Sequence, residues 1–434
     1  MSEYKNLIKK INSTANIGII GLGYVGLPLA IRFAEEQHRV FGFDIDPKKV
    51  KLLNASSSYI KHIPNSRIKK LKAFFTFTSD ISNIENCDVV IVCVPTPLTK
   101  NREPDLSFLK NTANSMVDHI KKGQLFCIES TTFPGTTEEI MLPIIEKSGF
   151  EVGKDIFLAY SPEREDPGNK NYSTSNIPKV VGGITDQCLN LASKIYSKVI
   201  NEVVKVSSTQ TAEMTKLLEN IYRSVNIGLV NEMKMVADKM DIDIYEVINA
   251  ASTKPFGYTP YYPGPGLGGH CIPIDPFYLT WKAREFDIHT RFIELAGEVN
   301  THMPFWVIEK VINALNKAKK SINGAKILVL GVAYKKNVDD MRESPALHII
   351  NSLINKGGQV DYADPHIPEV KNLRTFKHSL KSIKLTKSSL SKYDLVLLTT
   401  DHDAFNYKLI QENSRLIVDS RGRFSKKLKN LTRA

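Results

Sequence analysis

The chain has 434 residues, of which 42% are hydrophobic and 24% charged, and its formal net charge is +12 at pH 7. These values describe an ordinary soluble globular protein that is long enough for two or three domains. No apolar run is long enough to span a membrane, and the polar N-terminus lacks the apolar core of a signal peptide. We therefore expect a cytoplasmic protein with no membrane association.

The lysines and arginines are spread along the chain without an arginine-rich tract, so nucleic acid is a weak candidate partner. A solvated basic surface explains the charge most simply, although the same field would attract a multiply charged anionic substrate. The five cysteines include no CxxC pair and their number is odd. This pattern favours a reduced intracellular protein over a disulfide or zinc framework, and we expect no metal site.

The first part of the chain alternates apolar, strand-like runs with helical segments. A strand at 16–20 leads into a glycine-rich turn and a helix at 27–36, and a second strand at 39–43 ends in Asp44. Such alternation is typical of a parallel sheet with helices on both faces. Further strands are predicted at 88–94, 125–129 and 156–160, and a strand at 203–206 closes this domain.

The segment 211–240 contains no proline and one glycine, and its apolar residues recur at the spacing of a long amphipathic helix. Its apolar stripe is too long to bury against one small domain, so we expect a spine between domains and a dimer surface. A third part begins like a nucleotide-binding domain at 326–331. It continues with strands at 359–362, 394–400 and 415–420.

The predicted fold class is α/β, with two Rossmann-like doubly wound domains joined by a long central helix and a helical dimerisation domain. We expect the domains to span 1–206, 207–315 and 316–434.

The first motif is the turn Gly21-Leu22-Gly23-Tyr24-Val25-Gly26. Gly21 permits a tight turn, Gly23 lets the backbone approach a pyrophosphate, and Gly26 allows close packing of helix on strand. A GxGxxG pattern alone is weak, but this one joins a strand to a helix and is followed by Asp44. That carboxylate can bind both adenosine ribose hydroxyls and would repel a 2′-phosphate, which favours NAD over NADP. The alternative is a purely structural glycine turn.

The second motif is Gly268-Gly269-His270-Cys271, which ends a loop rich in aromatics, prolines and glycines. A single cysteine is usually a small buried hydrophobic residue. Here the glycine pair precedes it and a helix is predicted at 277–284, so the thiol lies near a helix start, where its pKa would fall. Asp275, about one turn further on, could hold a water or a base.

Three weaker patterns complete the candidate residues. Lys216 and Asn220 lie four apart on one helical face, and spacing alone favours a solvated lysine beside a polar neighbour. The turn 161–169 places three carboxylates after a strand, as either a site or a surface turn would. The third part lacks the glycine motif after Gly331 but offers cations near probable strand ends, which suit an anionic ligand: Lys335, Arg342 and Arg421.

Together these segments resemble the UDP-glucose/GDP-mannose dehydrogenase family over essentially the whole chain. Several dispersed motifs in the right order carry the resemblance. They are Gly21–Gly26, Val94-Pro95-Thr96-Pro97, Ser130-Thr131, Ser161-Pro162-Glu163, Glu213 to Lys216 with Asn220, Gly268 to Cys271 with Asp275, and Lys335 to Pro345.

Within that family, the variant 163–169 and the segment 263–275 resemble those of bacterial UDP-N-acetyl-D-glucosamine 6-dehydrogenases, which supply uronic-acid precursors for surface polysaccharides. One departure concerns a second glutamate, four residues after Glu163 in UDP-glucose dehydrogenases. This chain has Pro167 there, and whether Glu165 or Asp166 substitutes is open.

The resemblance implies a role for each candidate residue. NAD would be bound by Gly21, Gly23, Tyr24, Val25, Gly26, Asp44, Thr96, Thr131 and Arg342. Catalysis would use Cys271, Lys216, Asn220, Asp275, Glu163 and Thr131. The UDP-sugar would contact Glu163, Arg164, Lys216, Asn220, Tyr258, Tyr261, Gly268, Lys335 and Arg421.

The implied reaction is a four-electron oxidation of the sugar's primary alcohol to a carboxylate, using two NAD per sugar and a covalent adduct on Cys271. Lys216 and Asn220 would stabilise the oxyanion, and Asp275 or Glu163 would position water. The alternatives are the same chemistry on UDP-N-acetylmannosamine, UDP-N-acetylgalactosamine or UDP-glucose. A further alternative is a nucleotide-sugar-binding regulator, although such a protein needs neither Cys271 nor Lys216.

Overall fold

The computed structural model describes residues 2–434 except 61–62, 100, 165–173, 270–271, 372–375 and 426–427. The chain divides into two compact units. Unit 1 consists of residues 1–219 and 277–288, and unit 2 consists of residues 220–276 and 289–434. The long predicted helix is α8, Thr209–Lys239, which begins in unit 1 and ends in unit 2.

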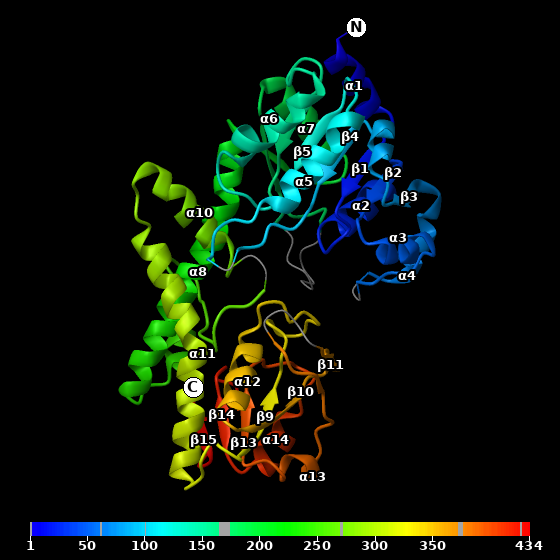
Figure 1. Cartoon of the computed structure of the whole chain (residues 1–434). Coiled ribbons are helices and arrows are strands. Elements are labelled where there is room, and N and C mark those ends of the chain that lie inside the picture. The colour runs from blue at the N-terminus through cyan, green and yellow to red at the C-terminus, as the bar shows by residue number, and fades with distance from the viewer. Residues whose placement is uncertain are drawn as a thin grey trace. The chain divides into compact units, whose positions relative to one another are not determined.

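Unit 1 is built on an eight-stranded sheet with the strand order β3-β2-β1-β4-β5-β6-β7-β8, drawn in blue to green in Figure 1. All six strands that we predicted for this domain are present within two residues of their expected ends. The strands are β1 (Ile17–Ile20), β2 (Val40–Phe43), β3 (Phe75–Thr78), β4 (Val89–Val92), β5 (Leu125–Ile128), β6 (Phe157–Tyr160), β7 (Lys179–Gly183) and β8 (Val203–Lys205).

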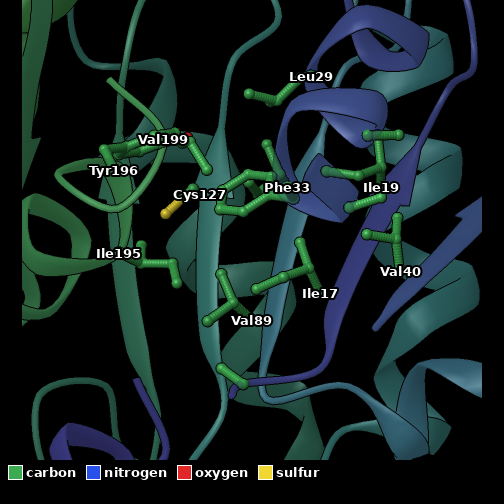
Figure 2. Packing of buried hydrophobic residues seen from close by; sticks show 14 of the residues in the cluster. Ile17, Ile19, Leu29, Phe33, Val40, Val89, Cys127, Ile195, Tyr196 and Val199 are labelled. Carbon is green, nitrogen blue, oxygen red and sulfur yellow. The ribbon is translucent and has the colours of Figure 1, made fainter. Parts of the chain in front are cut away.

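Helices cover both faces of this sheet, as predicted for a doubly wound domain. Alternate strand residues therefore face two separate cores, and the central strands read as continuous apolar runs. Figure 2 shows one core, in which Ile17 of β1 and Val89 of β4 pack with Phe33 of α2 and Ile195 of α7. The helices are α1 (Glu3–Asn12), α2 (Gly26–Glu35), α3 (Pro47–Asn54), α4 (Asn65–Lys70), α5 (Ser107–Met116), α6 (Leu142–Ile145), α7 (Asp186–Tyr196) and most of α10 (Asp275–Ala283).

Two strands, β7 and β8, run opposite to the others and so depart from the predicted all-parallel arrangement, since β8 pairs parallel with β7. β7 is antiparallel to β6, with Tyr160 opposite Gly182. Beyond the end of β6, the Ser161 hydroxyl donates a hydrogen bond to the Val180 carbonyl of β7 (2.8 Å). The segment that carries Glu163 is consequently held at the carboxyl edge of the sheet.

Unit 2 contains a five-stranded parallel sheet with the order β10-β9-β13-β14-β15 and a two-stranded antiparallel ribbon, β11-β12 (yellow to red in Figure 1). Apolar clusters again lie on both faces of the larger sheet. The strands are β9 (Lys326–Leu330), β10 (Gln359–Ala363), β11 (Glu369–Val370), β12 (Leu380–Lys381), β13 (Leu395–Leu398), β14 (Ile417–Asp419) and β15 (Leu431–Arg433). The helices are α9 (Ile244–Ala251), α11 (Arg291–Lys317), α12 (Pro345–Asn355), α13 (Lys387–Leu390) and α14 (Tyr407–Asn413).

Candidate functional site

The glycine-rich turn of unit 1 lies between β1 and α2. Gly21 has φ +93°, and a Cβ on it would lie 2.6 Å from the Cys93 carbonyl oxygen. A Cβ on Gly26 would lie 2.0 Å from the Gly21 carbonyl oxygen, so α2 starts as close to the turn as a glycine allows. At Gly23, by contrast, no heavy atom among the described residues would lie within 4 Å of an added Cβ. The turn is therefore tight on its inner side and open where a phosphate would approach the N-terminus of α2.

Asp44 follows β2 directly and is almost buried, with 9% of the residue exposed. Its carboxylate accepts hydrogen bonds from the backbone N–H groups of Leu22 (3.1 Å) and Asp46 (2.9 Å), and from Lys49 Nζ (3.0 Å). The carboxylate is thus fixed beside the glycine turn, where an adenosine ribose would lie. Open space at Gly23, a helix start and this carboxylate together fit the adenosine and pyrophosphate parts of NAD.

Two threonines predicted to lie near the nicotinamide follow the next strands of the sheet. Thr96, 2% exposed, comes after β4, and its carbonyl accepts a hydrogen bond from the Tyr278 hydroxyl (3.0 Å). Thr131 comes after β5, where the preceding Ser130 hydroxyl donates to the Val94 carbonyl (2.7 Å). Because β1, β4 and β5 are adjacent and parallel, these residues share the carboxyl edge with the glycine turn.

Lys216 and Glu163 form a buried ion pair in unit 1. Lys216 is 4% exposed, and its ammonium group donates to the Glu163 backbone carbonyl and lies 3.3 Å from the Glu163 carboxylate. Spacing alone favoured a solvated lysine at position 216, and that interpretation is therefore wrong. A small hollow is lined both by Glu163 of this pair and by Val25 of the glycine turn.

Arg164, predicted to contact substrate, contacts two groups within the protein. Its guanidinium binds the Glu219 carboxylate (2.7 Å) and donates to the Pro178 carbonyl (2.6 Å). These contacts tie the 161–164 segment to α8 and to the residue before β7. Residues 165–173, which include Glu165, Asp166 and Pro167, lie outside the described residues.

In unit 2, Asn220 and Asp275 are both buried, each with 1% of the residue exposed. The Asn220 side-chain amide donates to the Asp275 carboxylate, and its oxygen accepts from the Arg223 guanidinium. Helix α10 begins at Asp275, four residues after Cys271. Cys271 and His270 lie outside the described residues, so the predicted nucleophile stays a prediction.

The glycines before Cys271 pack against the segment after β9. A Cβ on Gly268 would lie 2.7 Å from the Tyr334 Cβ, and the Gly269 N–H donates to the Arg342 carbonyl (3.0 Å). Gly269 also has φ +85°, which favours glycine. The structure therefore brings the loop predicted to carry the nucleophile next to the segment that carries Lys335 and Arg342.

The predicted cations of unit 2 lie near the carboxyl edge of its sheet. Arg421 follows β14; its Nε donates to the Thr399 carbonyl (2.8 Å), and its guanidinium packs against Gly264. Arg342 pairs with Asp340 at 2.6 Å, and Lys335 is partly exposed. Of the two predicted tyrosines, Tyr258 is 38% exposed and Tyr261 contacts the Tyr222 ring, with centroids 5.8 Å apart.

Sequence reasoning missed several residues that hold these groups in place. Glu213, fully buried on α8, accepts hydrogen bonds from Thr132, Gly135 and Thr137, and so ties the loop after Thr131 to the helix. Its spacing of three residues from Lys216, on the same face, was an available signal. Glu219 and Lys234 were also missed, because each is a charged residue on a helix whose partner is remote in sequence, and Arg223 was missed although it contacts Asn220 on the same helix.

The described residues lack two further features. None of their helices is long and apolar enough to cross a membrane. No group of three or more histidine, cysteine, aspartate or glutamate side chains among them could hold a metal ion.

Comparison with known proteins accounts for this combination of two nucleotide-type sheets and a long helix. Residues 15–200, 210–302 and 328–426 match the NAD binding, central and UDP binding domains of the UDP-glucose/GDP-mannose dehydrogenase family. Protein CapL of Staphylococcus aureus is 35% identical over 94% of this chain and 96% of its own length. The UDP-N-acetyl-D-glucosamine 6-dehydrogenase of Pseudomonas aeruginosa is 34% identical over 90% of this chain and 91% of its own.

Among solved structures, the UDP-D-ManNAc dehydrogenase of Pyrococcus horikoshii superposes with a TM-score of 0.86 at 32% identity, covering 96% of this chain and 98% of that one. The fold and the glycine turn thus define an NAD-dependent dehydrogenase that acts on UDP-sugars. The chain belongs to the UDP-glucose/GDP-mannose dehydrogenase family.

Proposed function

We propose that this protein, in the cytoplasm, oxidises UDP-N-acetyl-D-glucosamine to UDP-N-acetyl-D-glucosaminuronate for surface polysaccharide synthesis. Support comes from the segments 163–169 and 263–275, which resemble those of bacterial UDP-N-acetyl-D-glucosamine 6-dehydrogenases. The Pseudomonas relative carries that name at 34% identity, while the similar Pyrococcus structure is named for the manno epimer. The choice of sugar therefore rests on the two segments and not on overall similarity.

The observation that carries the proposed chemistry is the buried Lys216–Glu163 pair at the edge of the sheet that holds the glycine turn. Keeping an ammonium ion away from water is unfavourable unless it is paired, and such an ion is well suited to stabilise an oxyanion in a dry site. In the proposed reaction Lys216 exchanges part of its contact with Glu163 for the substrate oxygen. Asn220, whose amide is oriented by Asp275, supplies a second donor.

The proposed reaction consumes two NAD and one water for each sugar. NAD, when bound by the glycine turn and Asp44, supplies the hydride acceptor for both oxidations. The primary alcohol first loses a hydride and a proton to give an aldehyde, and the Cys271 thiolate adds to its carbon. Oxidation of this thiohemiacetal gives a thioester, which water cleaves to the carboxylate and the free thiol. Glu163 and Asp275 are the proposed groups for positioning that water.

Unit 2 supplies the proposed binding groups for the nucleotide. In this proposal Lys335 and Arg421 bind the UDP diphosphate, and Arg342 contributes to NAD binding. The sugar pocket is lined by Tyr258, Tyr261 and Gly268. The domain boundaries at 206/207 and 315/316 belong to this proposal.

Substrate identity is tested by steady-state NADH production with a panel of UDP-sugars. We expect UDP-N-acetyl-D-glucosamine to be oxidised far better than UDP-glucose, because a pocket built for an acetamido group leaves polar groups unpaired around a hydroxyl. A clear preference for UDP-glucose would refute the substrate assignment. A preference for the manno or galacto epimer would show that the two segments recognise the acetamido group but not ring stereochemistry. No NADH with any UDP-sugar would favour a regulator.

The covalent step is tested with Cys271→Ala, and Cys188→Ala serves as a matched control because that thiol is buried in α7. Cys271→Ala should bind NAD normally and form no uronate, whereas Cys188→Ala should retain acid formation. Mass spectrometry of the products distinguishes uronate from aldehyde. Normal uronate production by Cys271→Ala would remove the thioester mechanism.

We also propose that two copies pair through an apolar stripe on α8. The stripe contains Leu218, Leu229, Met233 and Val236, which are between 45% and 65% exposed in the single chain, and Met240 follows directly after the helix. An exposed stripe of this length is typical of a protein–protein interface. Light scattering should show a dimer for the natural protein and a monomer for Leu229→Glu; a monomer for both would contradict the pairing.

A further inference from the structure

Lys335 lies in a short turn after β9 whose two ends are bound to the same buried pair of side chains. Before the turn, the Val332 and Ala333 N–H groups donate to Asp364 Oδ2 at 2.7 and 3.2 Å. After it, the Asn337 N–H donates to His402 Nδ1 at 2.9 Å. His402 Nε2 and Asp364 Oδ2 are 3.1 Å apart, and both side chains are fully buried. The three residues between the anchors, including Lys335, are thus closed into a loop by one histidine–carboxylate contact.

This arrangement fixes the tautomer of His402. A backbone N–H can only donate, so Nδ1 must be the unprotonated acceptor and Nε2 must carry the proton that is donated to Asp364. Burial alone would raise the pKa of Asp364, but the hydrogen bond from His402 and those from the backbone amides outweigh it and leave that pKa below its usual value. The carboxylate is therefore charged, and it orients the imidazole toward Asn337.

The neighbour of His402 holds the same turn from outside. The Asn337 side chain and Asp403 exchange two hydrogen bonds, at 2.7 Å from Asn337 Nδ2 and 3.0 Å from the Asp403 N–H. Lys336 forms an ion pair with the same carboxylate at 2.7 Å. Asn337 has φ +60°, an uncommon conformation for a residue with a side chain, and these contacts maintain it.

We propose that His402 and Asp403 are positioning residues for the nucleotide sugar, because they hold the Lys335 turn in its binding conformation before the ligand arrives. A flexible turn would have to be ordered on binding, and ordering lowers affinity. The proposal rests on the proposed function in one respect, namely that Lys335 binds the UDP moiety. It assigns no contact with ligand to His402 or Asp403 themselves.

Two amide replacements separate the contacts of the imidazole. In His402→Asn the side-chain oxygen can occupy the place of Nδ1 and accept from Asn337, but the side chain is too short to reach Asp364. In His402→Gln the amide can occupy the place of Nε2 and donate to Asp364, but no acceptor faces Asn337. We expect His402→Gln to raise the Kd for UDP roughly tenfold, the scale of one lost buried hydrogen bond. His402→Asn should stay within about threefold of the natural protein, because it keeps that bond.

The measurements are calorimetric titration of each full-length variant with UDP, and fluorescence titration with NADH. A positioning role predicts unchanged NADH affinity, and a raised KM for the UDP-sugar with kcat at saturation within about twofold, because a saturating ligand pulls the turn into place. Equal weakening of UDP binding by both amide variants, or none by His402→Gln, would overturn the role assigned to Nδ1.

Lys335→Ala distinguishes this inference from the proposed function. If Lys335→Ala does not weaken UDP binding, the assignment of Lys335 fails. If it weakens UDP binding and His402→Gln does not, only the positioning role fails. Should His402→Gln not fold, Asp403→Ala decides, since Asp403 is 58% exposed and its removal leaves the core intact. We expect a roughly threefold higher Kd for UDP in Asp403→Ala, as for loss of solvent-exposed contacts, and an unchanged Kd would overturn the proposal.

Discussion

The two sheets of this protein begin with the same local design and use it differently. In unit 1, β1 is followed by Gly21, which has φ +93° and whose added Cβ would lie 2.6 Å from the Cys93 carbonyl oxygen. In unit 2, β9 is followed by Gly331, which has φ +83° and whose added Cβ would lie 2.5 Å from the Thr400 carbonyl oxygen. In both, the neighbouring strand is followed by an aspartate, Asp44 or Asp364, that accepts hydrogen bonds from N–H groups of the turn.

The difference lies in what surrounds the aspartate and the turn. In unit 1 the turn continues through Gly23 into open space, and the Asp44 side chain, 7% exposed, pairs with Lys49. In unit 2 the turn continues through buried Val332 and Ala333, and Asp364 is sealed by His402. A tight turn after the first strand therefore does not by itself make a dinucleotide site. Free space over the turn and an available carboxylate are also required, and unit 2 has used its carboxylate to anchor a loop.

The largest effect that follows from this contrast concerns stability. Asp364→Ala removes the acceptor of four backbone N–H groups and of His402, so we expect a loss of about 3–5 kcal/mol in the free energy of unfolding. Asp44→Ala, its counterpart, should lose only about 1 kcal/mol because water can replace its bonds. Urea unfolding of both variants measures the difference; equal losses would mean that the two aspartates play the same part.

A second effect concerns cofactor affinity. Gly23→Ala places a Cβ in the open space of the unit 1 turn, so the fold should tolerate it while the approach of a pyrophosphate is blocked. We expect NADH binding to weaken by about 100-fold, comparable with the loss of several backbone contacts. Gly331→Ala is the matched control: it should lower the melting temperature and leave NADH affinity of the folded protein unchanged. If both variants weakened NADH binding, the assignment of the cofactor to the unit 1 turn would be wrong.

A third, smaller effect concerns the choice between NAD and NADP. The natural enzyme should prefer NAD, since in the proposed cofactor site Asp44 would face a 2′-phosphate. Asp44→Ala should narrow the preference by about tenfold, partly because Lys49, now unpaired, can attract that phosphate. In the double variant Asp44→Ala/Lys49→Ala the increase in kcat/KM with NADP should be smaller than in Asp44→Ala alone. The ratio of kcat/KM for the two cofactors is the measurement, and an unchanged ratio in the single variant would refute the role of Asp44.

The smallest effect concerns the turn that carries Arg421. Lys234 of α8 is buried and donates to the Ser420 carbonyl (3.1 Å). Burial lowers the pKa of Lys234 to about 7, a shift that Asp419 opposes and that Arg421 and Arg433 reinforce. Because the unfolded lysine binds a proton more tightly than the folded one, stability should increase as pH rises above 7.

Lys234→Met should remove this dependence. Relative to that variant, the natural protein should gain about 1 kcal/mol between pH 7 and pH 8. Thermal or urea unfolding at the two pH values provides the measurement. If the free energies of unfolding of the natural protein and the variant differed by the same amount at both pH values, Lys234 would have the same protonation in the folded and unfolded states.

Sequence patterns predicted the central strands and the long helix because these elements carry strong, continuous signals. The strands that were missed lie at sheet edges or contain unfavourable residues. β3 is an edge strand with mixed exposure, β15 has three half-buried residues, and β7 begins with Lys179 and ends in two glycines. An edge strand is buried on fewer sides, so its apolar pattern is weaker.

The candidate site shows the same limit at the level of side chains. Motifs identified residues such as Lys216 and Asp275 but not the contacts that orient them. Lys216 meets Glu163 53 positions away, and His402 meets Asp364 38 positions away. Spacing along one helix or strand contains no information about such pairs. The role expected of Lys216 came from the resemblance to a family and not from its spacing.

The burial of the cysteines has a practical consequence for counting working enzyme molecules. Cys87, Cys127 and Cys188 are buried, and burial raises the thiol pKa of Cys87, Cys93 and Cys127. Thiolates, not thiols, react with alkylating reagents, so these side chains are poor targets near neutral pH. Rapid uptake of one iodoacetate label per chain, with peptide mapping to Cys271 and protection by UDP-sugar, would therefore serve as an active-site titration. The labelled fraction would then give the proportion of competent centres in a preparation without reference to its turnover rate.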